Sequence, residues 1–109
     1  MKLLFAIIQN DDAKPLTREL VEHNIRVTRI SSSGGFLSGG NQTLMIGVEK
    51  DRLQDALDII KSKSHRRETI LPASMPHLGH IMDTATMPLT VTIGGAVVFV
   101  VDAESFYRF

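Results

Sequence analysis

"KLLFAIIQ", residues 2–9, is the stretch from which the fold can be worked out. It holds an unbroken apolar run from Leu3 to Ile8 between polar ends. Such a run is shorter than an ordinary buried helix, and it is typical of a strand that is covered on both faces. We therefore predict a buried strand at this position, with the other elements of the chain packed around it.

The next segment, residues 10–24, predicts a helix. Asp11 or Asp12 can cap its N-terminus, and Pro15 fits only within its first turn, where the backbone N–H has no helical partner. The predicted buried face consists of apolar residues at helical spacing, namely Ala13, Leu16 and Leu20.

Residues 25–33 and 42–49 predict two strands that pair antiparallel. Apolar and polar residues alternate at the start of the first strand, in the order Ile25, Arg26, Val27 and Thr28. Because successive side chains of a strand point to opposite faces, Arg26 and Thr28 are expected on one side and the two apolar residues on the other.

The connection between these strands is the glycine-rich loop "GGFLSGGN", residues 34–41. It places Phe36 and Leu37 between two pairs of glycines. An exposed aromatic ring gains nothing in a loop by itself. These two side chains therefore either pack onto their own domain or are covered by a ligand or a partner.

The second half of the chain repeats the plan of strand and helix. Asp51 is predicted to cap a second helix, whose apolar stripe consists of Leu53, Ala56, Leu57 and Ile60. Residues 68–87 show no sustained period and predict a long loop, in which only "ETIL" has strand character. Residues 88–109 predict two strand-like pieces around Gly94 and Gly95, followed by an aromatic tail.

The order β-α-β-β-α-β predicts an α+β, ferredoxin-like fold with both helices on one face of a single sheet. At 109 residues the chain is one domain, residues 1–109. The other face of the sheet would then leave apolar side chains in water, so we expect a homo-oligomer that covers it. The alternative is that the loop 68–87 folds over that face.

Composition narrows the classes of function. Acidic and basic residues balance at twelve each, which argues against binding nucleic acid through its phosphates. Without cysteines there is no thiolate metal site and no cysteine nucleophile. No apolar run approaches the length of a membrane span, and the N-terminus does not fit a secretion signal, so we expect a cytoplasmic protein without a membrane contact.

Polar groups gather around the predicted hairpin. Arg26 and Thr28 share a face of the first strand, Asn41 begins the second, and Gly47 lies further along it. A guanidinium and glycine amides suit a phosphate, whereas a carboxamide and the Phe36 ring suit a purine. This set predicts a nucleotide site. The alternative is a plain hairpin turn beside a solvated strand face.

The chain resembles the PII-like cyclic di-AMP receptor family. The residues that carry the resemblance are "NIRVT" (24–28), "GGFLSGGN" (34–41), Gly47, "IGGAVVFVV" (93–101) and the closing "FYRF" (106–109). The resemblance implies a homotrimer of ferredoxin-like subunits that binds cyclic di-AMP at intersubunit clefts, without catalysis and without a cofactor. It also implies a signal that is passed to a protein partner by ordering of a loop.

Carried over residue by residue, the resemblance implies a ligand-binding set. Its members are Asn24, Arg26, Val27 and Thr28 on the first strand, Gly35, Phe36 and Leu37 in the loop, Asn41 and Gly47 on the return strand, and Arg108 in the tail. The family often has glutamine where this chain has Arg108. An amide both donates and accepts, whereas a guanidinium only donates or stacks, so Arg108 is expected at a phosphate or a ring.

Four other functions stay open from the residues. A PII-type nitrogen regulator binding ATP would have its long loop between the second and third strands, where this chain has a short one. An acylphosphatase-like enzyme would use Arg26 and Asn41, but its phosphate loop corresponds here to the acidic "QNDD" (9–12). An RNA-binding surface would need exposed aromatics on the central strands, and the phenylalanines there sit in runs that look buried.

The fourth alternative is a metal site in the long loop. His77 and His80, with Asp83 beyond them, have a spacing that allows ligation. Because this loop is long, apolar and without a period, it is also the predicted contact for the downstream partner.

Overall fold

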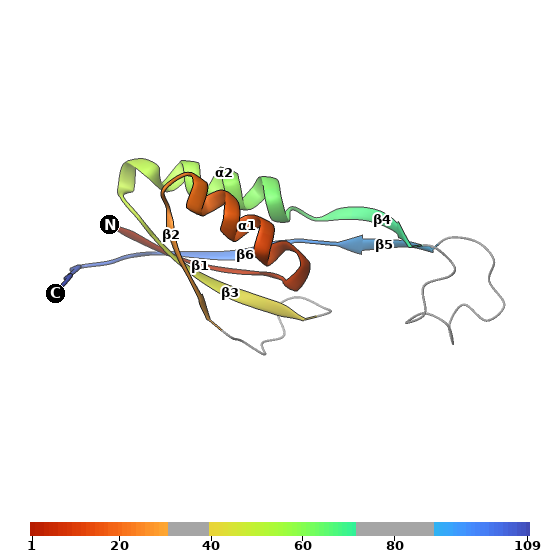
Figure 1. Cartoon of the computed structure of the whole chain (residues 1–109), viewed down its shortest axis with the longest axis horizontal. Helices are drawn as coiled ribbons and strands as arrows, with labels where there is room; N and C mark the ends of the chain where they lie inside the picture. The colour runs from red at the N-terminus through yellow and green to blue at the C-terminus, as the bar shows by residue number, and fades with distance from the viewer. Residues whose placement is uncertain (31–39, 72–88) are drawn as a thin grey trace.

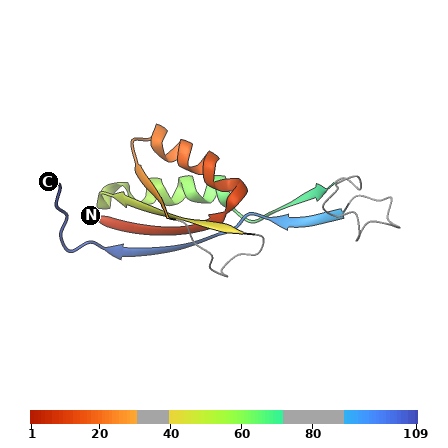
Figure 2. The same ribbon diagram turned by 60° about the horizontal axis from the view of Figure 1, so that its bottom comes forward.

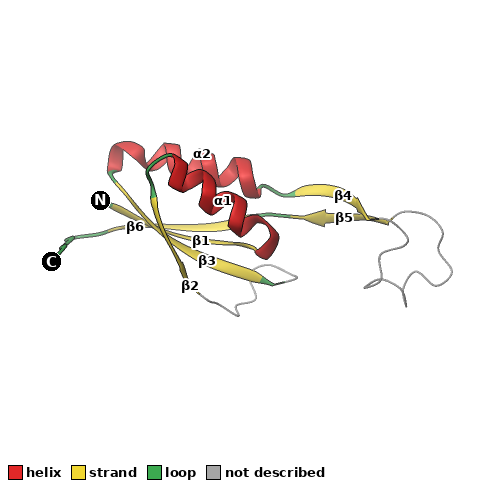
Figure 3. Cartoon of the chain, in the orientation of Figure 1, coloured by secondary structure: helices red, strands yellow, loops and turns green. Residues whose placement is uncertain are grey.

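The computed structural model describes residues 1–30, 40–71 and 89–109. They form an antiparallel four-stranded sheet with two helices on one face and a two-stranded ribbon that projects from one end (Figures 1 and 3). The elements are β1 (Lys2–Gln9), α1 (Asn10–Glu22), β2 (Arg26–Ile30), β3 (Asn41–Val48), a 3-10 turn (Lys50–Arg52), α2 (Leu53–Ser64), β4 (Arg67–Leu71), β5 (Leu89–Ile93) and β6 (Ala96–Asp102).

The main sheet has the strand order β2-β3-β1-β6, so the apolar strand β1 lies in its interior as predicted. Both neighbours run antiparallel to it, with Leu4 opposite Ile46 of β3 and Val100 of β6. This topology is compatible with the predicted ferredoxin-like plan. The β4–β5 ribbon is an addition to that plan, placed between α2 and β6.

The core lies between the sheet and the two helices. Figure 2 shows both helices on the same side of the sheet. The fully buried side chains that fill this layer are Leu4, Ile8, Leu16, Leu20, Leu44, Ile46 and Ile60. Side chains of alternate residues on β1 and β3 reach it, which is the period of a strand with one face against a helix layer.

The predicted helix caps are wrong. α1 begins at Asn10, immediately after β1, and neither helix has a side-chain cap. Asp12 lies inside the first turn, and its carboxylate is held by Arg67 instead. Asp51 lies in the 3-10 turn that precedes α2. The helix begins at Asn10, the first residue of the predicted span, so Pro15 lies inside it rather than in its first turn, and Pro15 has no N–H to donate to the carbonyl four residues earlier.

Part of the predicted loop 68–87 is a strand. β4 pairs with β5 antiparallel, with Arg67 opposite Ile93 and Glu68 opposite Thr92. This confirms the strand character of "ETIL" and extends it by Arg67. Residues 72–87, and with them His77, His80 and Asp83, lie outside the described residues.

Neither helix covers the second face of the sheet, which we call the open face. Its residues alternate with those of the core and include Leu3, Phe5 and Ile7 on β1, Met45 on β3, and Val97, Phe99 and Val101 on β6. Val101 is 44% exposed and Ile30 on β2 is 38% exposed. An apolar sheet face of this kind is typical of a surface that a partner covers.

Candidate functional site

The predicted polar residues of β2 lie on the open face. Arg26 stands opposite Gly47 across the β2–β3 ladder, and Thr28 stands opposite Met45 two residues further along. The row of facing residues that begins with Arg26 and Gly47 continues onto β1, because Leu3 pairs with Gly47 from the other side. Arg26 and Thr28 are both exposed, so a guanidinium and a hydroxyl stand side by side above an apolar sheet.

Gly47 leaves space beside Arg26. Among the residues that the structure describes, a Cβ built on it would meet only the Met1 sulfur, at 3.6 Å, which is an ordinary van der Waals distance. The packing of these residues therefore does not require a glycine here. Its missing side chain keeps the backbone accessible at the point where Arg26 stands.

Two shallow grooves flank this position. One of about 200 Å³ is lined by Met1, Asn24, Ile25, Arg26, Gly47, Val48, Glu49 and Arg52. The other, of about 620 Å³, is lined by Val21, Asn24, Ile25, Arg26, Val27 and Thr28. Asn24 belongs to both, and it is held at their rim in the left-handed region with φ 60°, which asparagine tolerates.

The structure thus brings Asn24, Arg26, Thr28 and Gly47 together. Val27 faces the helix layer, opposite Ile46, and only its backbone belongs to this cluster. Asn41 lies at the other end of β3, where it pairs with Gln9 and is 7% exposed. At about 3.3 Å per residue, the six steps from Asn41 to Gly47 along the strand span roughly 20 Å.

The remaining predicted site residues are not part of this cluster. Gly35, Phe36 and Leu37 lie outside the described residues. Arg108 is exposed in the tail that leaves the sheet after Asp102 (Figure 1). In that tail the rings of Tyr107 and Phe109 stack with centroids 6.2 Å apart.

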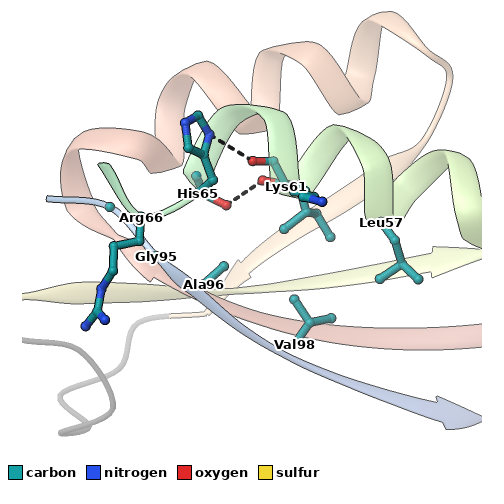
Figure 4. Close-up of a pocket in the computed structure, with 10 residues that line it drawn as sticks. Leu57, Lys61, His65, Arg66, Gly95, Ala96 and Val98 are labelled. Atoms are coloured by element: carbon teal, nitrogen blue, oxygen red, sulfur yellow. Dashed lines mark hydrogen bonds between the residues drawn. The ribbon is translucent and has the colours of Figure 1, made fainter. Parts of the chain in front are cut away.

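A different groove, of about 470 Å³, lies between α2 and β6 (Figure 4). Leu57 and Val98 form its apolar part, and Lys61, His65 and Arg66 are its basic residues. These basic groups do not converge. The His65 ring donates to the Lys61 carbonyl at 3.2 Å, and Arg66 points to the other side of the chain. Because basic groups are favoured near the C-terminus of a helix, the dipole of α2 is enough to explain why these residues are found here.

Sequence patterns did not predict the ion pair between Arg67 and Asp12. The Arg67 guanidinium donates to both Asp12 carboxylate oxygens, at 2.6 and 3.3 Å, and to the His65 carbonyl at 3.0 Å. The hydrogen bonds that Arg67 donates to Asp12 raise the pKa of Arg67 above its ordinary value, whereas burial acts in the opposite direction. A bidentate pair of this kind fixes orientation as well as distance.

Neither a metal site nor a membrane span is found in residues 1–30, 40–71 and 89–109. No three histidine or carboxylate side chains of these residues gather to hold an ion. Neither of the helices described there has the length and apolar character to cross a bilayer.

The comparisons with known proteins agree with this geometry. A crystal structure of a functionally unknown protein from Pediococcus pentosaceus is similar to this chain, with 40% sequence identity and a TM-score of 0.80. The similarity covers 99% of this chain and 96% of that one. The sequence profile of the cyclic-di-AMP receptors matches residues 1–109. Because this match spans the whole chain and confirms the resemblance seen in its motifs, the chain belongs to the cyclic-di-AMP receptor family.

Proposed function

We propose that this protein is a cytoplasmic receptor that binds cyclic di-AMP at the clefts of a homotrimer and passes the bound state to a protein partner. The observation that carries the proposal is the match of the receptor family to residues 1–109. The match includes Asn24, Arg26, Thr28 and Gly47, which we call the polar cluster. The receptor family also supports a binding protein rather than an enzyme.

The polar cluster suits the chemistry of the ligand. Cyclic di-AMP carries two phosphates and two adenines in one ring. Arg26 can donate two parallel hydrogen bonds to a phosphate, and Thr28, on the same face, can donate a third. The missing side chain of Gly47 lets the ligand approach the backbone of β3. Phe36 then stacks on one adenine, and Asn24 or Asn41 reads a base edge.

Two observations support a site between subunits. The grooves at Arg26 are shallow, and a ligand bound there by one chain would keep much of its surface in water. The open face beside them carries exposed apolar side chains such as Val101 and Ile30. A second subunit that covers this face would remove apolar surface from water and deepen the cleft at the same time.

The direct test is calorimetric titration of the purified protein with cyclic di-AMP, cyclic di-GMP and ATP in parallel. We expect saturable binding of cyclic di-AMP alone, near one ligand per subunit. Binding of ATP without cyclic di-AMP would instead place the protein with the nitrogen regulators. If neither cyclic di-AMP nor ATP produces heat, the receptor function is overturned.

A further inference from the structure

The β1–α1 turn, by which we mean residues 9–12, consists of the last residue of β1 and the first residues of α1, and it is bonded to two parts of the molecule that are distant in sequence. On one side it holds the start of β3. Gln9 pairs with Asn41 in the sheet, and the Asn10 N–H donates to the Gly40 carbonyl at 3.3 Å. A Cβ on Gly40 would come within 2.8 Å of the Asn10 side chain, so this side chain lies close against the Gly40 backbone.

On the other side the same turn holds the base of the ribbon. The Gly94 N–H donates to the Gln9 side-chain oxygen at 2.6 Å. Asp12, three residues later, holds Arg67 at the start of β4. Figure 1 shows β4 and β5 leaving the body at the end of the sheet where α1 begins.

Gly94 packs tightly into this junction. Its φ of 81° is in the left-handed region. A Cβ there would lie 2.5 Å from the His65 carbonyl oxygen and closer still to the Arg67 guanidinium. The backbone of Gly94 is therefore held between the amide of Gln9 and the guanidinium that Asp12 orients. A displacement of the turn moves both ends of the ribbon together.

We propose that Asp12, Arg67 and Gly94 form a joint that couples the Asn41 end of the cyclic di-AMP site to the direction of the β4–β5 ribbon. The proposal rests on the proposed function, since the ligand is the input. The physical link is short. Asn41 is the sheet partner of Gln9, and Gln9 holds Gly94 directly. Ligand bound at Asn41 would bias this joint, and the joint would in turn bias the affinity by the same factor.

The joint is built so that it can open. Arg67 is about one third exposed, at 34%, so its guanidinium can return to water when the pair breaks. Asp12 is 6% exposed, but it lies in the first turn of α1, where the helix N–H groups and dipole favour a negative charge. Opening the pair would therefore return Arg67 to water and leave Asp12 as a buried carboxylate, whose cost the N-terminal dipole of α1 offsets in part. Two arrangements of similar free energy are what a coupling element requires.

Hydrogen exchange measured by mass spectrometry, with and without cyclic di-AMP, tests the coupling. Peptides from β2 and β3 report binding itself, and peptides covering residues 67–71 and 89–93 report the ribbon. In the natural protein we expect the ligand to slow exchange at least fivefold in both places. In Arg67→Met the ribbon response should fall below twofold while β2 and β3 stay protected. Arg66→Met, which removes the exposed neighbouring arginine, should behave like the natural protein.

A second variant guards against a local folding defect. The double change Asp12→Asn with Arg67→Gln removes both charges and keeps hydrogen-bonding groups at both positions. It too should bind ligand and lose the ribbon response. A ribbon response that survives in both variants, or a natural protein whose ribbon ignores the ligand although β2 and β3 are protected, overturns the joint alone. Absence of protection anywhere overturns the proposed function, and the joint with it.

Discussion

Arg26 and Arg29 belong to the same five-residue strand but lie on opposite faces of the sheet. Arg26 stands opposite Gly47 on the open face, whereas Arg29 stands opposite Leu44 on the helix side and reaches Gln42 at 3.4 Å. Both side chains are exposed. The strand therefore supplies two arginines that share chemistry and local sequence and differ in the face they occupy.

Arg26→Gln should weaken binding of cyclic di-AMP by about 10- to 150-fold, the range of a charged hydrogen bond of about 1.5–3 kcal/mol. Arg29→Gln should leave the affinity within about threefold, because its side chain lies on the helix side of the sheet. Calorimetric titration of the two variants beside the natural protein measures both. Equal losses would mean that the phosphate is attracted by general charge and that the open face holds no specific site.

Alanine substitutions at Gly47 and Gly94 should have very different effects on the free energy of unfolding. Gly94→Ala forces a side chain into a left-handed, fully packed position and should destabilise the fold by at least about 1–2 kcal/mol. Gly47→Ala adds a methyl group that makes an ordinary contact with the Met1 sulfur, and it should change the free energy of unfolding by less than about 0.5 kcal/mol. Urea unfolding measures these changes.

The same Gly47→Ala variant tests the ligand site. A methyl group beside Arg26 should lower the affinity for cyclic di-AMP about tenfold, or about 1.4 kcal/mol, because it blocks the approach to the β3 backbone. Unchanged affinity in a folded Gly47→Ala protein would place the ligand away from this part of β3.

Val101 and Ile70 offer a matched test of assembly. Val101 is 44% exposed on the open face, and Ile70 is 65% exposed on β4 of the ribbon. A charge at Val101 would be buried against a second subunit, so Val101→Glu should lower the molar mass measured by light scattering from that of a trimer to that of a monomer. Ile70→Glu should leave the mass unchanged. The opposite result would move the subunit interface to the ribbon.

The fall in the free energy of unfolding at acid pH should depend in part on Asp102. Its hydrogen bond with Lys2, helped by the lysine charge, holds the pKa of Asp102 below its ordinary value. A lowered folded-state pKa adds stability above the unfolded pKa of about 3.9, and that stability is lost as the pH falls through the folded pKa. Urea unfolding between pH 2 and 7 should therefore show Asp102→Asn less stable than the natural protein at pH 7, with the two converging at the acid end. Parallel curves would show that the pair adds nothing.

Local patterns in the sequence were enough for most of the fold. The apolar run Leu3–Ile8 predicted an interior strand, and the alternation around Val27 predicted which side chains face the helices; the structure confirms both. These features depend on residues a few positions apart, whose burial follows directly from their spacing.

The parts that the sequence did not predict depend on distant residues. Asp12 has the residue type and place of a helix cap, but its carboxylate is taken by Arg67, which is 55 residues away. The alternation of β2 showed that Arg26 points outward. It could not show that Gly47 stands opposite, because this depends on the register of the hairpin. The ribbon's pairing of β4 with β5 is long-range in the same sense.

The chain enters and leaves the ribbon at nearly the same place. The Gly95 N–H donates to the Ser64 carbonyl at 2.5 Å, so the last residue of α2 lies next to the residue that precedes β6. The residues between these two form an insertion that the main sheet does not need for its own connectivity. This insertion can therefore be exchanged, lengthened or shortened by recombination without changing the order of the other elements, provided that Arg67 and Gly94 are kept. Proteins built on this plan can thus differ in the ribbon while the main sheet and its two helices stay the same.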